Sequence, residues 1–271
     1  MTAPIVTLTT DFGLRDPYVA EMKAVILGIQ RDVHLVYVTH DVQRHDVTEG
    51  ALALEAAARF FPPGTIHVAV VDPGVGTARR GIVVDSGGHR FVGPDNGLFT
   101  TFVSESGWSA FELTAADYRL PDVSRTFHGR DIFAPAAGHL ARGLEPARLG
   151  PRVTDPVRLV WPEVHEVAGT VAGAVVHVDR FGNLVTSIHG DAVRALGPHV
   201  TVRIAGRAVP LVTTYGELPA GRAGALIGSQ NRLEVAVREG SAAAALRARR
   251  GMPVIVTLRR LLSVKRRSRK D

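Results

Sequence analysis

The chain has 271 residues, of which 45% are hydrophobic and 21% charged, with no cysteine and a formal net charge of +6. This composition is that of a soluble globular protein, and the lack of cysteine excludes disulfides and cysteine-ligated zinc or iron–sulfur sites. The charge does not indicate a basic binding face, because the last 13 residues alone carry seven basic residues and one acidic residue.

The first 150 residues alternate between strand-like and helix-like segments. Apolar, β-branched runs predict strands at residues 5–9, 34–39 and 66–71. Apolar residues at three-to-four spacing predict a helix after the first strand, with Asp16 as its N-cap. An alanine-rich helix to about residue 61 follows the second strand, so the order of elements predicts a mainly parallel sheet with right-handed crossovers.

The remaining signals of this half are a capping pair, a hairpin and a third helix. Asp46 and Glu49 have the spacing of a capping pair at the start of the alanine-rich helix. Residues 82–85 and 90–92 flank a Ser-Gly-Gly-His turn, which predicts a β-hairpin. Residues 133–143 are expected to form a helix.

The pattern changes near residue 150, where Pro and Gly residues indicate a linker. Only residues 241–250 look helical beyond this point. The short β-rich segments that follow predict a small β-barrel or sandwich, and they lie at residues 170–178, 184–188, 200–204, 208–212, 233–237 and 254–258.

We therefore predict an α/β fold with an N-terminal α/β domain, a mainly parallel sheet and a C-terminal β-barrel domain. The expected divisions are residues 1–158 for the α/β domain, 159–168 for a linker, 169–258 for the barrel, and 259–271 for a basic tail that is disordered after the last strand.

Several functional classes have no motif in the chain. There is no GxGxxG after a strand, no P-loop, no HExxH and no GxSxG. No apolar run approaches the roughly 20 residues of a membrane helix, and no signal peptide is visible. We expect a cytoplasmic protein with no membrane partner and no specific nucleic-acid partner.

The strongest local signal is residues 71–80, VDPGVGTARR, where a buried strand ends in a carboxylate. Ligands bind beyond the carboxyl ends of parallel strands, so Asp72 and the arginines after the glycine-rich loop are candidates for a site. The alternative is a tight turn with a capping Asp72 and a surface pair of arginines. Asp11, which ends the first strand in TTDFG at residues 9–13, lies at the same predicted edge.

Two further segments carry polar groups in loops. His128, in FHGRD at residues 127–131, precedes a helix and can titrate near neutral pH, although a solvated loop histidine is the alternative. In HVDRFGN at residues 177–183, Asp179, Phe181 and Asn183 would share one side of an extended segment. The alternative there is a turn closed by Asp179.

These four segments, in this order, resemble the family of S-adenosyl-L-methionine hydroxide adenosyltransferases, relatives of the fluorinase and chlorinase. The resemblance covers nearly the whole chain, from residues 9–13 to IGS at residues 227–229 and beyond. It implies hydrolysis of S-adenosyl-L-methionine to adenosine and methionine with no metal or other cofactor. It also implies a homotrimer with its active sites between neighbouring subunits.

The resemblance implies roles for individual residues. Asp72, Arg79 and His128 would surround the attacking water, and Arg79 is preferred over Arg80 on spacing. The substrate contacts implied are Asp11 for the ribose hydroxyls, Asp16 and Asp179 for the methionine ammonium, Phe181 and Tyr215 for the adenine faces, Asn183 for the adenine edge, and Ser229 for the methionine end.

These residue types suit the displacement. When the carbon–sulfur bond of the sulfonium breaks, methionine leaves as a neutral thioether and needs no general acid. The poor nucleophilicity of water therefore limits the reaction. Arg79 can polarise the water or stabilise nascent hydroxide, His128 can accept a proton, and Asp72 can orient either partner.

Three competing hypotheses stay open at this point. The first is a halogenase, but the halogenase relatives have aromatic, non-ionising residues where Asp72 and His128 stand, which favours water over halide here. His45 stands where the halogenase pattern has a Trp, which leaves the packing around the sulfonium and ribose open. The second is a non-catalytic protein that binds an adenosyl ligand, and the third is a module that binds polyanions through the basic tail.

Overall fold

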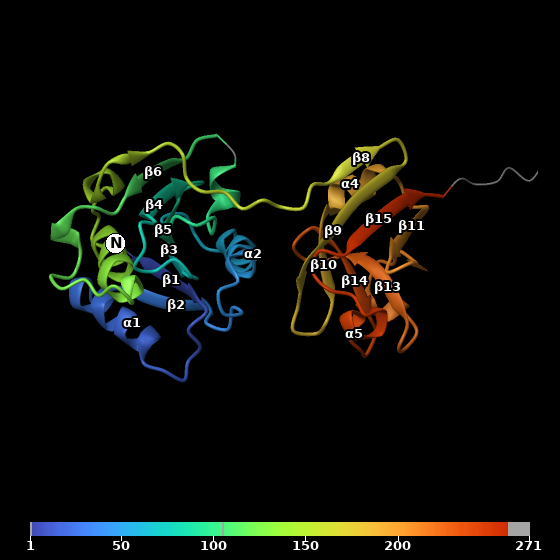
Figure 1. The fold of residues 1–271 in the computed structure, drawn as a ribbon, viewed down its shortest axis with the longest axis horizontal. Coiled ribbons are helices and arrows are strands. Elements are labelled where there is room, and N and C mark those ends of the chain that lie inside the picture. The colour runs from blue at the N-terminus through green and yellow to red at the C-terminus, as the bar shows by residue number, and fades with distance from the viewer. Residues whose placement is uncertain (1, 105, 260–271) are drawn as a thin grey trace, which may run out of the picture. The chain divides into compact units, whose positions relative to one another are not determined.

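The computed structural model describes residues 2–104 and 106–259, and the chain divides into two compact units, Met1–Leu159 and Val160–Asp271 (Figure 1). Except for Arg259, the expected basic tail lies outside the described residues. Within the described ranges, none of the helices is both long and apolar enough to cross a membrane.

The described residues of the first unit form seven strands and three α-helices, and the sequence analysis predicted their order as far as the hairpin at residues 82–92. The strands are β1 (Ile5–Thr10), β2 (His34–Thr39), β3 (Ile66–Val70), β4 (Gly81–Ser86), β5 (His89–Pro94), β6 (Ser109–Glu112) and β7 (Arg152–Val153), and the α-helices are α1 (Tyr18–Ile29), α2 (Val47–Ala58) and α3 (Ala134–Ala141).

The strands of this unit form one mixed sheet in the order β2-β1-β3-β5-β4-β6-β7. The pairings from β2 to β5 are parallel, as expected, whereas β5-β4, β4-β6 and β6-β7 are antiparallel. The switch arises at the β4–β5 hairpin, where Gly87 and Gly88 both have positive φ and reverse the chain in two residues. The α/β class is confirmed, and the parallel part of the sheet is limited to its first four strands.

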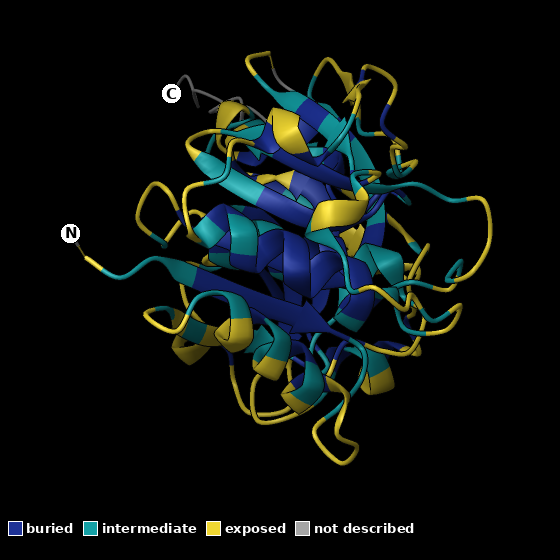
Figure 2. Cartoon of the chain, turned by 90° about the vertical axis from the view of Figure 1, so that its left-hand side faces the viewer, coloured by how far each residue is buried: buried dark blue, intermediate teal, exposed yellow. Residues whose placement is uncertain are grey.

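Helices cover both faces of the sheet. Ile66, Val68 and Val70 of β3 pack in a cluster with α1 and α3, whereas Ala69 and Val71 pack in a second cluster with α2. This alternation follows from the two-residue period of a strand, and it explains why residues 66–71 are apolar apart from His67. Figure 2 shows buried residues along the strands and inner helix faces, with exposed residues on loops.

The helix ends agree with the sequence analysis in part. Asp46 caps α2 and accepts a hydrogen bond from the Glu49 N–H at 3.0 Å, as predicted. The prediction that Asp16 caps α1 is wrong, because Pro17 occupies the N-cap position and its carbonyl accepts from the Glu21 N–H. The Asp16 side chain instead lines a pocket, described below.

The second unit is a nearly closed antiparallel barrel, which confirms the expected C-terminal β-fold. Its strands run in the order β12-β11-β15-β9-β10-β14-β13, with β8 paired to β9. The elements are β8 (His165–Val167), β9 (Thr170–Val178), β10 (Leu184–His189), α4 (Gly190–Ala195), β11 (Val200–Ile204), β12 (Arg207–Val209), β13 (Ala223–Ile227), β14 (Arg232–Val237), α5 (Ala242–Leu246) and β15 (Pro253–Leu258).

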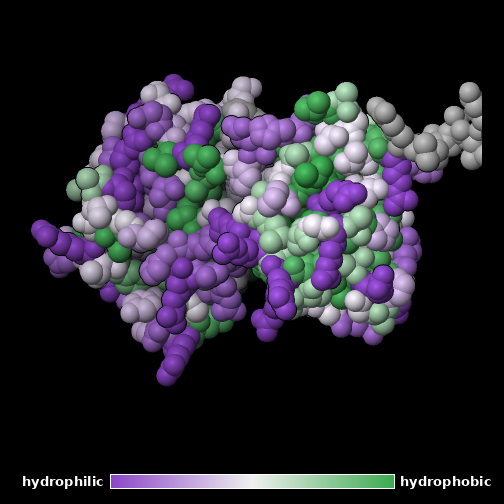
Figure 3. All heavy atoms as spheres, turned by 45° about the vertical axis from the view of Figure 1, so that its right-hand side comes forward, coloured by the Kyte–Doolittle hydropathy of each residue, from purple (hydrophilic) through white to green (hydrophobic). Residues whose placement is uncertain are grey.

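The gap between the two edge strands of the barrel, β12 and β13, is partly closed by the residues that follow β12. Leu211 forms an isolated bridge with Ala225 of β13, and the Val212 N–H donates to the Ala225 carbonyl at 2.8 Å. Helix α5 is shorter than the expected residues 241–250, because Arg247 adopts a left-handed conformation that ends it. In Figure 3, hydrophilic residues cover much of the visible face of the first unit, whereas hydrophobic and hydrophilic residues are mixed on the visible face of the second unit.

A buried histidine lies in the parallel part of the sheet. His67 of β3 is fully buried between its register partners, Thr7 of β1 and Phe91 of β5. Its Nδ1 lies 2.8 Å from Thr7 Oγ1, its Nε2 lies 3.3 Å from His89 Nδ1, and its ring stacks on Phe91. Burial, with a smaller effect of His89, lowers the pKa of His67 to about 3.

This histidine should make the stability of the first unit depend on pH. The unfolded chain, in which the His67 pKa is near 6.5, binds the proton more readily, so stability falls as pH drops from about 6.5 toward 3. At pH 4.5 we expect His67 to cost about 2 to 3 kcal/mol. In urea unfolding, His67→Asn should reduce the difference between pH 7 and pH 4.5 by that amount. The exposed His165→Asn serves as control, and an unchanged slope in His67→Asn would contradict the assignment.

Candidate active site

The site begins at the carboxyl ends of β1 and β3, which are neighbouring parallel strands. Asp11 follows β1 directly, and Asp72 follows β3 by two residues. Because parallel strands end at the same edge of a sheet, both carboxylates reach the same pocket. The prediction that they share an edge is confirmed by the strand pairing.

The glycine-rich loop after β3 brings an arginine back to the strand end. The Val75 N–H donates to the Asp72 carbonyl at 3.2 Å and closes a tight turn that returns Arg79 toward Asp72. Gly76 has a φ of +77°, and a Cβ at this position would lie 2.3 Å from the Arg125 carbonyl oxygen. Glycine is therefore required here on two grounds, backbone conformation and close approach to the neighbouring loop.

Asp72, Arg79 and His128 form a contiguous set. Arg79 Nε donates to Asp72 Oδ1 at 2.8 Å, and Arg79 Nη2 donates to Asp72 Oδ2. The same Nη2 lies 2.8 Å from His128 Nδ1. The guanidinium is mostly buried and lies over the ring of Phe133. Among the described residues, Asp72 and His128 line the pocket, whereas Arg79 does not.

The loop that carries His128 is fixed by a buried carboxylate. His128 precedes a π-helical turn, Gly129–Phe133, which leads into α3. Asp131 within this turn is fully buried and accepts hydrogen bonds from the Ser124 N–H at 2.8 Å and from Arg130 Nε at 2.6 Å. π-helical turns are rare in proteins as a whole, and those that occur often lie at functional sites. Burial, and then the adjacent Arg79 charge, lower the pKa of His128.

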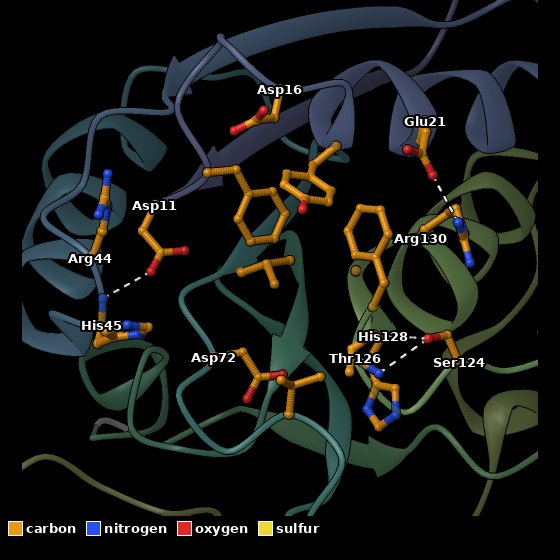
Figure 4. A pocket seen from close by; sticks show the side chains of 16 residues that line it. Asp11, Asp16, Glu21, Arg44, His45, Asp72, Ser124, Thr126, His128 and Arg130 are labelled. Atoms are coloured by element: carbon orange, nitrogen blue, oxygen red, sulfur yellow. Dashed lines mark hydrogen bonds and ion pairs between the residues drawn. The ribbon is translucent and has the colours of Figure 1, made fainter.

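The pocket has a volume of about 590 Å³ and is lined by residues of the first unit alone. Figure 4 shows Asp72 and His128 on one side of it and Asp16 on the opposite side. The lining residues are Asp11, Phe12, Asp16, Tyr18, Glu21, Arg44, His45, Val70, Asp72, Val75, Ser124, Thr126, Phe127, His128, Gly129 and Arg130.

Asp11 has a structural partner that the sequence analysis did not foresee. Its Oδ2 accepts a hydrogen bond from the His45 N–H at 2.9 Å (Figure 4), and His45 has a positive φ of 66°. The contact holds the loop after β2 against the loop after β1. It places Arg44 and His45 on the pocket wall; the family resemblance had pointed to the position of His45, whereas no motif indicated Arg44.

Three aromatic side chains form another part of the wall that sequence reasoning missed. Phe12, Tyr18 and Phe127 meet edge to face, with ring centroids 5.2 to 5.9 Å apart. Glu21 pairs with Arg130 at 2.8 Å beside them (Figure 4). The signal in the sequence was that each aromatic residue lies within two positions of a candidate acid or histidine, which is too weak to identify a shared wall.

Arg80, the neighbour of Arg79, points elsewhere. It pairs with Asp95 at 2.6 Å and with Asp155 at 2.8 Å. Arg79, and not Arg80, is therefore the arginine that contacts Asp72 and His128. Asp95 is buried and also accepts from the Val157 N–H, so its role in the described structure is to anchor the chain that leaves the first unit.

In the second unit, Asp179 closes the turn between β9 and β10. Its Oδ1 accepts from the backbone N–H groups of Phe181 and Asn183, and its Oδ2 accepts from Asn183 Nδ2. Asn183 is buried, whereas Phe181 is 76% exposed. The alternative of a turn closed by Asp179 describes this geometry, and it leaves the Phe181 ring available to stack on a flat ligand.

Tyr215 belongs to a second polar group in the same unit. Its hydroxyl donates to Glu234 Oε2 at 3.0 Å. Burial and the neighbouring Glu234 carboxylate raise the pKa of Tyr215 to about 12, and burial raises the pKa of Glu234. Glu234 was missed by sequence reasoning, although an acid within the apolar strand β14 was a usable signal. Ser229 is exposed in the turn between β13 and β14.

Comparison with curated proteins gives relatives of known activity. The chain is 43% identical over 253 residues to the (R)-S-adenosyl-L-methionine hydrolase of Thermus thermophilus, which covers 90% of this chain and 96% of the relative. It is 40% identical over 244 residues to the (R)-S-adenosyl-L-methionine hydrolase of Salinispora tropica, covering 89% and 92%. It is 30% identical over 222 residues to the fluorinase of Actinopolyspora mzabensis, covering 72% and 74%.

The fold is shared with solved structures. An uncharacterized conserved protein from Thermotoga maritima superposes with a TM-score of 0.87 at 34% identity, covering 93% of this chain and 99% of that chain. Family models for the N-terminal and C-terminal domains of SAM hydroxide adenosyltransferases match residues 6–150 and 173–255. The chain therefore belongs to the SAM hydroxide adenosyltransferase family.

Proposed function

We propose that the protein hydrolyses (R)-S-adenosyl-L-methionine to adenosine and L-methionine. The observation that carries the proposal is the set of Asp72, Arg79 and His128 at one side of the pocket, in a chain that is 40 to 43% identical to hydrolases with this substrate. In this proposal the protein is an enzyme, and ionisable groups in its active site position the attacking water.

The reaction is an in-line displacement at the adenosyl 5′ carbon. The oxygen of water forms the new bond to carbon as the carbon–sulfur bond breaks, and the electron pair of that bond goes to sulfur. The water loses one proton, so a group that faces the pocket must accept it or pass it to solvent. Positioning the water in line with the leaving sulfur is the main task of the site, since the leaving group needs no general acid.

The ionisable side chains of Asp72 and His128 favour water over a halide as the nucleophile. A halide must be desolvated and has no proton to lose, so carboxylate and imidazole groups at the nucleophile position would serve it poorly. A site with Asp72 and His128 instead supplies an anion and a hydrogen-bonding ring next to the nucleophile. The fluorinase relatives are also more distant than the hydrolases.

We propose the substrate contacts from the family resemblance. In the first unit, Asp11 would bind the ribose hydroxyls and Asp16 the ammonium group, and their positions on the wall of one pocket support this assignment. In the second unit, the roles proposed are Phe181 and Tyr215 for the adenine faces, Asn183 for the adenine edge, Asp179 for the ammonium group and Ser229 for the methionine end.

Assembly, location and cofactor use stay predictions. A homotrimer with sites between neighbouring subunits and a cytoplasmic location follow from the sequence analysis. The mechanism assigns every step to side chains of the chain itself, so turnover should persist after dialysis against a chelator.

The first test is product analysis in heavy-oxygen water. Incubation with (R)-S-adenosyl-L-methionine should give adenosine labelled at the 5′ hydroxyl together with unlabelled methionine, measured by mass spectrometry. The (S) epimer and added chloride serve as comparisons. Halogenated nucleoside would support the halogenase alternative, and tight binding without product would support a non-catalytic binder.

The second test replaces the carboxylate at the pocket. Asp72→Asn keeps the size of the side chain but removes its charge, so we expect kcat to fall by about 10²-fold or more with a much smaller change in KM. Asp155→Asn, at an exposed carboxylate that pairs with Arg80, is the matched control and should leave kcat unchanged. Equal kcat in Asp72→Asn and wild type would remove the assigned role.

The third test concerns the glycine contact that holds the two loops together. Gly76→Ala places a methyl group against the Arg125 carbonyl and should separate Arg79 from His128, so kcat should fall at least tenfold. Gly64→Ala shares the positive φ, at +87°, but has open space around its Cβ. It should lower stability by about 1 kcal/mol with no change in kcat. If Gly76→Ala and Gly64→Ala had the same kcat, the close contact between Gly76 and the Arg125 carbonyl would not be needed to hold the site together.

A further inference from the structure

The hydrogen bonds around Arg79 fix the direction of each donor. A guanidinium donates hydrogen bonds and accepts none. Nη2 carries two hydrogens, and its two partners are Asp72 Oδ2 and His128 Nδ1. One hydrogen therefore points to each partner. His128 Nδ1 must be the acceptor of its contact, with its lone pair toward Arg79.

The protonation of the imidazole ring follows from this contact. In a neutral ring one nitrogen is a donor and the other an acceptor, and the partner of one nitrogen decides which. Because Nδ1 accepts from Arg79, the ring proton resides on Nε2. The other ring nitrogen, Nε2, is then a donor, and it has no lone pair with which to receive a proton from water.

The surroundings of His128 keep the ring neutral. Burial and the Arg79 charge lower its pKa, and Arg119 acts in the same direction. Asp72 and Asp131 oppose this effect by smaller amounts than burial and Arg79 exert. Protonation at Nδ1 would also place two donors against each other across a 2.8 Å contact.

We propose that His128 positions the attacking water by donating from Nε2–H, and that Asp72 receives the water's proton. Arg79, which does not itself line the pocket, holds both groups in place from behind. This inference rests on the proposed hydrolase function and replaces the expectation that His128 is the proton acceptor.

The step balances with these assignments. The water oxygen accepts the Nε2–H hydrogen bond and keeps a lone pair for the 5′ carbon. As the carbon–oxygen bond forms and the carbon–sulfur bond breaks, the sulfur takes the electron pair and becomes a thioether. The released proton passes to the Asp72 carboxylate and then to solvent, so His128 ends the cycle in the tautomer in which it began.

Three substitutions at His128 separate the donor and acceptor functions. His128→Asn places an amide oxygen near the Nδ1 position and keeps the contact with Arg79, but it loses the donor. His128→Gln places an amide NH₂ near the Nε2 position and keeps the donor, but it loses the acceptor. His128→Ala loses both functions, and none of the three variants can act as a base.

We expect kcat to be highest in wild type, lower in His128→Asn and His128→Gln, and lowest in His128→Ala. We expect each amide variant to lose about tenfold and Ala to lose about 10²-fold to 10³-fold, with KM changed less than kcat. Equal, large losses in all three variants would overturn the proposal in favour of a base. Unchanged kcat in all three variants would also overturn it. Thermal unfolding midpoints near that of wild type show that the comparison concerns folded protein.

A second measurement does not depend on activity. Long-range nitrogen–proton NMR spectra of uniformly ¹⁵N-labelled protein at pH 7, with His128→Asn used to assign the signal, report which ring nitrogen carries the proton. A protonated Nε2 and an unprotonated Nδ1 are expected. An Nδ1–H tautomer or an imidazolium would overturn the inference, even if product analysis confirms hydrolysis. If product analysis instead fails, this tautomer still tests the geometry separately.

Discussion

The guanidinium of Arg79 is the interaction on which the site depends, because it joins two loops that lie far apart in the sequence. It binds Asp72 through a pair of hydrogen bonds and binds His128, 49 residues further along the chain, through the same nitrogen that reaches the carboxylate. A planar group with fixed donor directions suits this task better than a lysine ammonium would. Two pocket-facing groups are thereby oriented by one cation that stays mostly buried.

The backbone makes this arrangement possible. Parallel pairing of β1 and β3 brings Asp11 and Asp72 to the same edge of the sheet, and the turn after Asp72 returns the chain within seven residues. The glycine at residue 76 lets that turn contact the neighbouring loop. Buried Asp131 then ties down the segment before His128. Each contact is local in space, and the pairing across Arg79 joins side chains from both loops.

Sequence patterns predicted the elements whose signals are local. Strands β1, β2 and β3, the β4–β5 hairpin and the Asp46 cap depend on periodicity or on turn residues within a few positions. Strand β13 was missed because its Ala-Gly-Ala start lacks the bulky side chains of a typical strand, and β8 was missed because it is short and exposed. The cap at Asp16 was wrong because the choice between two adjacent residues is made by backbone geometry.

The same distinction between local signals and contacts across the fold applies to the site. Strand ends and family resemblance indicated Asp72, Arg79 and His128, but no pattern could show that Arg79 donates to both of the others. Arg44 and Glu21 were not predicted because their positions on the pocket wall depend on contacts between segments that are distant in the sequence. In the second unit, the carboxylate in the middle of the apolar strand β14 was a usable signal, but its tyrosine partner could be identified only from the structure.

The π-helical turn after His128 has an evolutionary consequence. Such turns are equivalent to one residue inserted into an ordinary helix, and each residue of a helix advances the side-chain direction by about 100°. A homologue one residue shorter between Gly129 and Phe133 would form a continuous α-helix into α3. The imidazole would then rotate away from Arg79, so deletion of a single codon would break the contact between Arg79 and His128 while leaving the fold intact.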